Sequence, residues 1–537
     1  MKKNFSKIFF SILTVFVLFF SSCATDAGKK VVQPMTRTAN GAKEGVYYEI
    51  FVRSFADSNG DGIGDFNGIT AKLDYLNDGD DTTTTDLGIT GIWLLPIFET
   101  MSYHGYDVTN YYSINPVYGT MEDFENFLTE AKKRGITVII DMVFNHSSVF
   151  HEWFQYSKDP ESKYHSWYRW TDGNDPRYNI NRKIWGHNVW NKVGNNYYVG
   201  LFSSDMPDFD ASNPAVREEF KKILKFWLDK GVDGFRFDAA SHIFNSSELP
   251  VGEQGTERSI EFWQEICDYA RSVKPDCYLV GEVWEQTITR ANFMKALQST
   301  FHFDLGTKIV DTVKYEDGGK NSLAEAMYGD YQTYRDANPD YIDAPFLTNH
   351  DQNRVSGLLR MNAESLKMAA SLYILTEGIP FIYYGEEIGM NGGARPDSGD
   401  IQIRTPFMWG GNDPYTTTWT ESLYNKKTIP LNEQVKDPMS LQIHYRKLIR
   451  VKTAYEALYE GRMTPSAVDA SQIVSWFMES DNQKAFVMHN VNKTETVTVE
   501  VPQAEGMEMV FASNEGVIRE GNKVIIPGNT SCVFVTL

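Results

Sequence analysis

Short apolar runs alternate with amphipathic stretches along the chain from Tyr47 to about residue 450. The runs are nearly continuous in apolar residues, which is typical of strands buried on both faces of a parallel sheet. Several follow stretches with a helical spacing of apolar residues, at 124–134, 216–230 and 260–273. The eight runs begin at Tyr47, Ile89, Gly135, Gly234, Cys277, Ser299, Pro345 and Pro380. Eight strands with intervening helices predict a (β/α)8 TIM barrel, with a doubly wound open sheet as the alternative.

Two segments break this pattern and predict separate domains. Residues 147–211 show no clear helical period and are rich in aromatic residues, which indicates an inserted domain after the third strand, over the C-terminal face of the barrel. Residues 455–537 contain short alternating strands separated by polar turns and predict a C-terminal antiparallel β-sandwich. The predicted barrel therefore comprises residues 45–146 and 212–454.

The N-terminal segment has the pattern of an export signal. Three lysines precede an apolar run at 8–20, which is too short to span a bilayer comfortably. Residues 1–22 predict a signal peptide, and the small residues before Cys23 resemble a bacterial lipoprotein signal, in which the cysteine carries the lipid. Phe20 stands where Leu is usual, so a secreted protein without lipid is the alternative. Residues 23–44 are polar and small and predict a tether.

The composition narrows the class of partner. The chain has 51 lysine and arginine residues against 71 aspartate and glutamate residues, and the net charge of −20 disfavours nucleic-acid binding. Aromatic residues make up 14%, which favours a stacking surface for flat ligands. Cys267, Cys277 and Cys532 lack the spacing of a zinc site and predict buried thiols. We expect a monomer.

Charged and polar residues collect where the apolar runs end. The carboxyl ends of all strands in a TIM barrel meet at one rim, where active sites lie. Burying an unpaired carboxylate costs several kcal/mol, so the convergence of this many polar groups predicts a functional site. These residues are Asp141, Asn145, His146, Arg236, Asp238, Glu282, His350 and Asp351.

Paired carboxylates suit the cleavage of a glycosidic bond, because one must be ionised and the other protonated. Arg236 lies two residues before Asp238, on the same face of the strand, and would keep Asp238 ionised. Glu282 follows the apolar run YLVG, where desolvation raises the pKa of a carboxyl group, as a proton donor requires.

Six sequence blocks then resemble a known family, in the same order along the chain. They are DMVFNH (141–146), MPDFD (206–210), GFRFDAASH (234–242), GEVW (281–284), FLTNHD (346–351) and GIPFIYYGEEIGM (378–390). Four of them resemble the signature regions of glycoside hydrolase family 13, the α-amylase family, and the other two resemble further blocks of that family. The resemblance covers about residues 45–450, and the trailing β domain fits the family's C-terminal domain.

The resemblance implies roles for individual residues. Asp238 would be the nucleophile, Glu282 the acid/base, and Asp351 a third carboxylate that grips the 2- and 3-hydroxyls of the sugar. Tyr106 would be the stacking platform for an α-glucan substrate. The other implied substrate-binding residues are His104, His146, Arg236, His242 and His350.

The chain departs from the amylase pattern at Ser241, where many α-amylases carry Lys, which puts the contact with the leaving-group side of the substrate in doubt. Ala239 resembles amylases more than oligo-1,6-glucosidases. The resemblance therefore implies an intermediate subgroup that cleaves internal α-1,4 bonds of starch and maltodextrins. The alternatives are an α-glucosidase, oligo-1,6-glucosidase or neopullulanase of the same family, or a non-catalytic glucan-binding protein, against which the complete set of three carboxylates argues.

A second polar group, DSNGDGIGD at 57–65, follows the first predicted strand. Oxygen-bearing side chains at positions 1, 3, 5 and 9 and Gly at position 6 match a calcium loop, although position 12 is Gly68 rather than the bidentate Glu of an EF-hand. Similar loops in the family bind calcium. The implied ligands of a structural Ca²⁺ are Asp57, Asn59, Asp61, Ile63 and Asp65, and a second calcium site is a hypothesis for Asn145, Asp208 and the His242 carbonyl.

Overall fold

A computed structural model of the chain describes residues 32–244, 255–319, 322–468 and 470–536. The predicted signal peptide and Cys23 lie outside these residues. Among the helices within them, none is long and apolar enough to cross a membrane.

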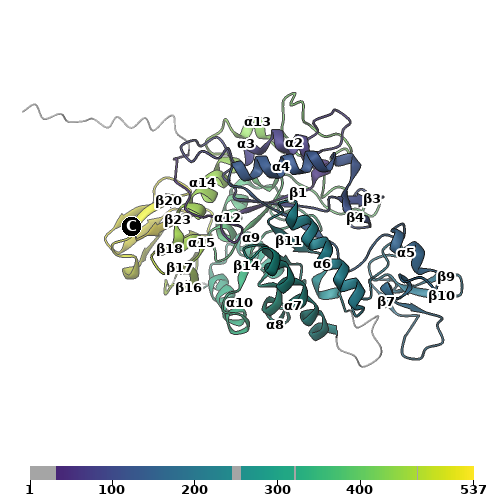
Figure 1. Cartoon of the computed structure of the whole chain (residues 1–537). Coiled ribbons are helices and arrows are strands. Elements are labelled where there is room, and N and C mark those ends of the chain that lie inside the picture. Colours follow the sequence, from purple (N-terminus) through teal and green to yellow (C-terminus); the bar gives the residue numbers. More distant parts are fainter. Residues whose placement is uncertain (1–31, 245–254, 320–321, 469, 537) are drawn as a thin grey trace, which may run out of the picture.

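Eight parallel strands form one sheet at the centre of the molecule (Figure 1), in the order β14-β13-β12-β11-β5-β2-β1-β15. Ile379 N–H donates to Asp343 O and Phe381 N–H donates to Pro345 O, which joins the two ends of the sheet. The strands are β1 (Tyr47–Ile50), β2 (Gly91–Leu94), β5 (Thr137–Met142), β11 (Gly234–Phe237), β12 (Tyr278–Gly281), β13 (Ser299–Phe301), β14 (Ile342–Ala344) and β15 (Phe381–Tyr383). The predicted TIM barrel is confirmed.

Amphipathic helices cover the outside of the barrel. In α6 (Pro214–Asp229), for example, Asn213 caps the helix, Pro214 occupies its first turn, and the face that carries Phe220 and Trp227 is buried. The long helices are α4 (Met121–Lys133), α6 (Pro214–Asp229), α7 (Gly255–Val273), α8 (Thr287–Leu297), α9 (Phe303–Tyr315), α10 (Ser322–Ala337), α12 (Ala363–Ile374) and α14 (Leu441–Ala454). Short helices are α1 (Val52–Phe55), α2 (Phe66–Ala71), α3 (Leu73–Leu76), α11 (Val355–Leu358), α13 (Leu431–Gln434) and α15 (Glu456–Tyr459).

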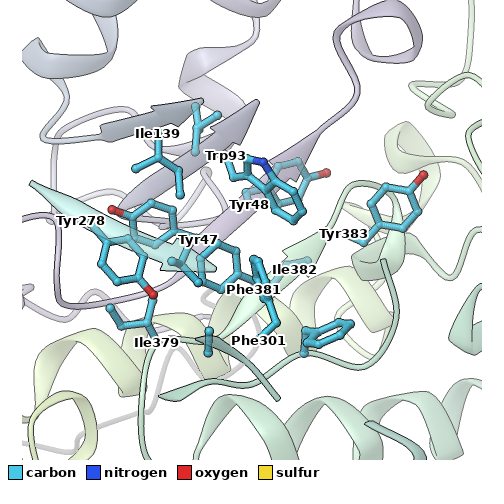
Figure 2. Close-up of a cluster of buried hydrophobic side chains, with 14 of the residues drawn as sticks. Tyr47, Tyr48, Trp93, Ile139, Tyr278, Phe301, Ile379, Phe381, Ile382 and Tyr383 are labelled. Carbon is cyan, nitrogen blue, oxygen red and sulfur yellow. The ribbon is translucent and has the colours of Figure 1, made fainter. Parts of the chain in front are cut away.

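Large aromatic side chains fill the barrel interior (Figure 2). Tyr47 stacks on Phe381 with ring centroids 5.0 Å apart, and Tyr278 contacts Tyr47 at 5.4 Å. Nearer the carboxyl ends of the strands, Trp93 contacts Phe301 at 5.2 Å. Because these side chains fill the interior of the barrel, they hold the carboxyl ends of the strands in fixed positions.

The inserted domain projects from one side of the barrel (Figure 1) and contains α5 (Glu152–Ser157), β6 (Trp170–Thr171), β9 (Trp190–Val193) and β10 (Asn196–Val199). A separate two-stranded hairpin, β7 (Lys183–Ile184) and β8 (His187–Asn188), turns at Trp185 and Gly186. The domain has a small core of its own, formed by Val189, Trp190, Val199 and Leu201. A further ribbon, β3 (Phe98–Thr100) and β4 (Val108–Ile114), belongs to the loop after β2.

The C-terminal domain lies on the opposite side of the barrel and consists of two antiparallel sheets (Figure 1). Their strands are β16 (Arg462–Pro465), β17 (Ile473–Glu479), β18 (Lys484–Asn490), β23 (Thr530–Val535) and β20 (Glu508–Ala512) in one sheet, and β19 (Val497–Glu500), β22 (Lys523–Ile526) and β21 (Ile518–Glu520) in the other. Phe486 and Phe534 of the first sheet and Val524 and Ile526 of the second share one apolar core. The arrangement agrees with the predicted β-sandwich.

The predicted tether was too long. Val32, Ala39 and Ala42 are buried, and the Thr38 and Ala39 N–H groups both donate to Thr453 O at the end of α14. Small residues allow this segment to pack closely on the barrel, so its polar composition does not make it a free linker. The three predicted buried thiols, Cys267, Cys277 and Cys532, are free and buried.

Candidate active site

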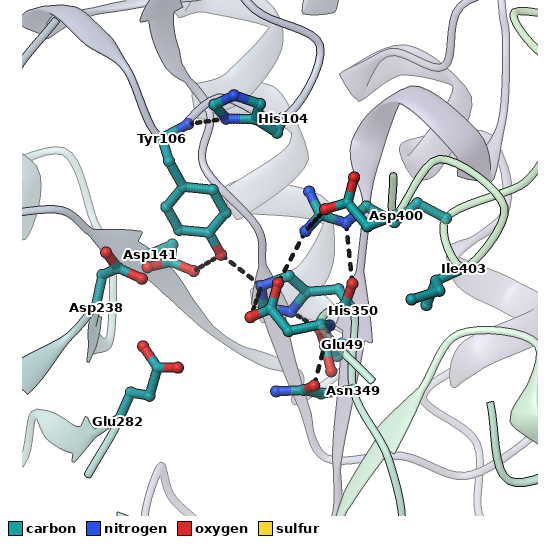
Figure 3. A network of polar contacts seen from close by, with 12 residues as sticks. Glu49, His104, Tyr106, Asp141, Asp238, Glu282, Asn349, His350, Asp400 and Ile403 are labelled. Atoms are coloured by element: carbon teal, nitrogen blue, oxygen red, sulfur yellow. Dashed lines mark hydrogen bonds and ion pairs between the residues drawn. The ribbon is translucent and has the colours of Figure 1, made fainter. Parts of the chain in front are cut away.

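The carboxyl ends of the neighbouring strands β5, β11 and β12 bring Asp141 together with two of the predicted catalytic residues, Asp238 and Glu282. Asp141 on β5 lies opposite Arg236 on β11, and β11 pairs with β12 just before Glu282. Beyond β11 the chain turns at Ala239, whose φ of 47° lies in the left-handed region. The Ala239 N–H donates to Glu282 Oε2 at 2.8 Å. Figure 3 shows Asp238 and Glu282 as neighbours at this edge of the barrel.

Arg236 binds three carboxylates at once. Its Nη1 donates to Asp141 Oδ1 at 2.8 Å and to Asp238 Oδ1 at 2.5 Å. Its Nη2 lies 2.9 Å from Glu282 Oε2. The guanidinium lies over the Trp93 ring, 5.2 Å from its centroid, and Arg236 is only 1% exposed. Because the guanidinium is planar and held on several sides, it fixes the relative positions of the carboxylates.

This cluster favours the uptake of one proton. When Asp141, Asp238 and Glu282 are all ionised, one guanidinium leaves two negative charges without a partner, and buried like charges raise carboxyl pKa values. Burial raises the pKa of Glu282 to about 7, against the lowering effect of Arg236. Burial also raises the pKa of Asp238 to about 6, again opposed by Arg236. At neutral pH Glu282 is therefore the better proton donor, and Asp238 is mostly ionised.

Asp351 has a different electrostatic environment. Its Oδ1 lies 2.9 Å from Arg404 Nη2, and its Oδ2 lies 3.1 Å from His350 Nε2. Burial alone would raise the pKa of Asp351, but these two cationic groups lower it well below its usual range. His350 Nδ1 also lies 2.6 Å from Glu49 Oε1. Although burial opposes the protonation of His350, Asp351 and Glu49 raise its pKa to about 9, so the imidazole is charged at neutral pH.

A cavity of about 880 Å³ opens over these groups, and Asp238, Glu282 and Asp351 all line it. Four of the predicted substrate-binding residues also line it, namely His104, Tyr106, His146 and His242. The other two, Arg236 and His350, lie below the cavity surface with their nitrogens bonded to carboxylates. In this position Arg236 and His350 orient the lining groups, and direct contact of His350 with sugar hydroxyls stays a prediction.

The lining side chains can bind hydroxyl groups. The Tyr106 hydroxyl donates to Asp141 Oδ2 at 3.1 Å, which fixes the ring, and its ring stacks on His104 at 6.1 Å. Burial lowers the pKa of His146 and of His242 to about 4. Both are therefore neutral at pH 7. The ring nitrogens of His146 already contact the Asn145 amide and the Tyr106 carbonyl, so hydrogen bonds from His146 to a sugar stay a prediction.

Sequence reasoning missed three residues of this site. Glu49 lies inside the apolar run YYEIFV, and a charged residue in such a run was a usable signal. Asp400 and Arg404 line the cavity from an irregular segment after β15, and Arg404 pairs with Asp351 and with Asp400. No local sequence pattern marks that segment.

The predicted calcium loop turns around Asp57. The Asp57 carboxylate accepts hydrogen bonds from three backbone N–H groups of the same loop, and the Asp65 carboxylate accepts from Ser58 and caps α2. In the described part of the chain no three His, Cys, Asp or Glu side chains come close enough together to hold a metal ion. A calcium ion here would need the Asn59 amide and the Ile63 carbonyl as well, together with Asp61. The metal therefore stays a prediction, and so does the second calcium site.

The chain matches the family description "Alpha amylase, catalytic domain" over residues 49–461 and "Alpha-amylase SusG C-terminal domain" over residues 473–533. It is 40% identical over 501 residues to Alpha-amylase 3 of Dictyoglomus thermophilum, a match that covers 92% of this chain and 93% of that protein. It is 31% identical over 524 residues to Oligo-1,6-glucosidase of Parageobacillus thermoglucosidasius, covering 84% of this chain and 90% of that protein.

The solved structures agree with the sequence comparisons. The crystal structure of an alpha-amylase from H. orenii matches with a TM-score of 0.83 at 39% sequence identity, covering 92% of this chain and 100% of that one. The family description spans the barrel, the inserted domain and all three carboxylates at the cavity. The chain therefore belongs to the α-amylase family of glycoside hydrolases, glycoside hydrolase family 13.

Proposed function

We propose that the protein is an α-amylase that hydrolyses internal α-1,4-glucosidic bonds of starch and maltodextrins with retention of the α configuration. The observation that carries this proposal is the set of three carboxylates at the cavity with different protonation states. Asp351 is held ionised by Arg404 and His350, and the pKa of Glu282, at about 7, lies above that of Asp238, at about 6, so Glu282 is the group of this pair that more readily carries a proton near neutral pH. This combination suits a double displacement at a glycosidic carbon.

In the first step Glu282 gives its proton to the glycosidic oxygen while an Asp238 oxygen attacks the anomeric carbon. The C–O bond to the leaving chain breaks, and a glycosyl ester of Asp238 forms. In the second step the ionised Glu282 takes a proton from water, whose oxygen displaces Asp238. Two inversions restore the α configuration. The contact of one guanidinium with both carboxylates supports the short separation that retaining enzymes require.

The alternative within the family is an exo-acting α-glucosidase or oligo-1,6-glucosidase. The support for this alternative is that the chain is 31% identical to an oligo-1,6-glucosidase. The exposed indoles of Trp185 and Trp284 in the cavity wall favour the endo-acting enzyme, because they provide stacking surfaces for further sugar units. We expect the viscosity of a starch solution to fall well before reducing sugar accumulates, with maltose and maltotriose among the products. Stepwise release of glucose with persistent viscosity would identify the exo-acting alternative.

The protonation states predict a bell-shaped dependence of kcat/KM on pH. Activity should fall below pH of about 6, where Asp238 becomes protonated, and above pH of about 7, where Glu282 loses its proton. With an α-glycosyl fluoride, whose leaving group needs no proton, the wild-type enzyme should lose the alkaline limb and keep the acidic limb. An alkaline limb that persists on the fluoride would show that this limb does not come from protonation of the leaving group by Glu282.

We also propose a structural Ca²⁺ at the 57–65 loop. One support is that the loop offers oxygen donors, which Ca²⁺ prefers as ligands. The other is that two of its carboxylates, Asp57 and Asp65, are buried, and neither forms an ion pair with a Lys or Arg among the described residues. Chelator should lower the melting temperature, and added Ca²⁺ should restore it, because an ion that binds only the folded state stabilises that state. An Asp61→Ala variant should melt lower and no longer respond to chelator. A wild-type melting temperature that chelator leaves unchanged would remove this site.

Export, lipid attachment at Cys23 and a monomeric state are further proposals. The first two are supported by the sequence of residues 1–23. Labelling with a fatty-acid analogue, compared between the wild type and Cys23→Ser, tests the lipid. Sedimentation of the soluble part tests the monomer.

A further inference from the structure

A buried glutamate lies in the first strand of the barrel, beneath the groups that line the cavity. Glu49 of β1 is 2% exposed and does not line the cavity itself. It follows Tyr47 by two residues, so its side chain points into the barrel on the same side as the Tyr47 ring, nearer the carboxyl end of the strand. A buried carboxylate is costly without a partner of opposite charge. Among the described residues, His350 is the only basic group within ion-pair distance of Glu49, with Nδ1 at 2.6 Å from Oε1.

His350 faces an acceptor at each of its two ring nitrogens, and Figure 3 shows Glu49 beside the ring. The Nε2 atom lies 2.7 Å from the Tyr106 hydroxyl oxygen and 3.1 Å from Asp351 Oδ2. Because a carboxylate only accepts hydrogen bonds, an imidazole between two carboxylates needs a proton on both nitrogens. His350 is therefore an imidazolium that donates from Nδ1 to Glu49. Its second N–H is shared by Asp351 and the Tyr106 oxygen.

The proton on Nε2 sets the direction of the hydrogen bonds beyond the ring. The Tyr106 hydroxyl accepts from His350 and gives its own proton to Asp141 Oδ2, at 3.1 Å. A neutral His350 that keeps its single proton on Nδ1 would present a lone pair at Nε2. That lone pair would draw the Tyr106 proton away from Asp141 and would repel the Asp351 carboxylate. The charge of His350 therefore determines how Tyr106 and Asp351, which both line the cavity, are held.

The charges around His350 favour the imidazolium. Burial alone would lower the pKa of His350, but Asp351 and Glu49 raise it to about 9. Asp351 also pairs with Arg404 at 2.9 Å, and Arg404 in turn pairs with Asp400 and donates from Nε to His350 O at 3.0 Å. The remaining charged groups at this rim are bound to one another, namely Arg236, Asp141, Asp238 and Glu282. Removal of the Glu49 charge should therefore act mainly on the proton of His350.

We propose that Glu49 is a positioning residue for the hydrolysis: its carboxylate keeps both nitrogens of His350 protonated, and the imidazolium holds Asp351 and Tyr106 in the orientation that the substrate meets. This inference rests on the proposed function. A glutamine at position 49 would fill nearly the same space and could accept the same hydrogen bond, but it would carry no charge. The charge of Glu49, rather than its shape, is therefore the property to test.

Glu49→Gln removes this charge, and α-maltotriosyl fluoride makes the effect visible because its leaving group needs no proton from Glu282. On this substrate the wild type should lose activity at alkaline pH only where His350 releases its proton, at pH of about 9. In Glu49→Gln this fall in kcat/KM should occur about one to three pH units lower, the range by which a close opposite charge shifts a pKa. At pH 6 the variant should stay within about threefold of the wild type, because the ordinary pKa of an imidazole is about 6.5.

The matched control is Glu387→Gln. Glu387 is another fully buried glutamate, its Oε1 accepts from the Tyr48 and Tyr75 hydroxyls, and it does not line the cavity. Its substitution removes a buried carboxyl group and leaves the partners of His350 in place, so the pH profile should match that of the wild type. A Glu49→Gln profile that also matches the wild type would overturn the proposal, since a merely space-filling Glu49 predicts that result.

The imidazole ¹⁵N resonances of His350 test the proposal without any substrate. The resonances that disappear in His350→Asn identify the residue, and their shifts distinguish a doubly protonated ring from a neutral one. We expect a doubly protonated ring at pH 7 in the wild type and a titration about one to three pH units lower in Glu49→Gln. Glu49→Asp keeps the charge and should titrate near the wild type.

A neutral His350 at pH 7 in the wild type, or an equal downward shift in Glu49→Asp and Glu49→Gln, would overturn the proposal. A wild type that does not hydrolyse the fluoride would instead overturn the proposed function, and the ¹⁵N titration would still decide whether Glu49 keeps His350 protonated.

Discussion

Asp238→Asn should abolish hydrolysis, with a fall in kcat of about 10⁴-fold or more, the range seen when a nucleophile is removed from an enzyme. The amide cannot form the glycosyl ester, so the first displacement has no nucleophile. The fold should persist because Asn has nearly the same shape as Asp and can still accept a hydrogen bond from Arg236, which now lies 2.5 Å from Asp238 Oδ1. Removal of one charge from a cluster with surplus negative charge should leave the melting temperature unchanged or raise it.

Release of reducing sugar from soluble starch and thermal melting are the two measurements for this prediction. Asp397→Asn is a matched control, because Asp397 is an exposed carboxylate that pairs with Arg395 and does not line the cavity. The control should retain the wild-type rate. An Asp238→Asn variant that keeps more than about a hundredth of the wild-type rate would contradict the assignment of the nucleophile.

Arg236→Leu should lower the free energy of unfolding by about 3–5 kcal/mol, as expected when one partner of a buried ion pair is removed. The guanidinium is the shared partner of Asp141, Asp238 and Glu282, and it is 1% exposed. Without it the pKa values of these carboxyl groups in the folded state rise further above their values in the unfolded chain.

The sign of the pH dependence follows from proton binding. In the Arg236→Leu variant the folded state binds more protons than the unfolded state, so its stability decreases as the pH rises. The difference in the free energy of unfolding between the wild type and Arg236→Leu should therefore be larger at pH 8 than at pH 5. Urea unfolding of both proteins at the two pH values measures this difference. Arg236→Lys keeps one charge but cannot bind all three carboxylates, so it should be more stable than Arg236→Leu and still poorly active. A variant as stable as the wild type at pH 8 would show that Arg236 is not the stabilising partner.

The catalytic carboxylates could be predicted because the fold places them. Once eight apolar runs predict a barrel, any charged residue that ends a run must lie at one rim, and Asp238, Glu282 and Asp351 meet there. The pairing of His350 with Glu49 could not be predicted, because it joins residues 301 positions apart through the closure of the barrel. Asp400 and Arg404 come from an irregular loop whose path depends on tertiary contacts.

In the inserted domain, too, the positions of individual side chains depend on tertiary contacts that the sequence pattern does not predict. The sequence shows that this domain is rich in aromatic residues but not which of them are buried, and in the structure Trp167, Tyr168, Trp190 and Tyr198 are buried. Trp185 reaches the cavity from a left-handed turn, and a sequence pattern does not predict such a turn at Trp, because turns of this kind favour Asn, Asp or Gly.

The configuration of the first sugar released tests the central claim most directly, because it depends on the separate roles of Asp238 and Glu282. Proton NMR during the first minutes of maltohexaose cleavage distinguishes the anomers before they equilibrate. Two displacements, with Asp238 as nucleophile and Glu282 as acid and then base, predict that the α anomer accumulates first and that the β anomer follows by mutarotation. If the β anomer accumulates first, water attacks the sugar directly, and the account of Asp238 as a covalent nucleophile is wrong.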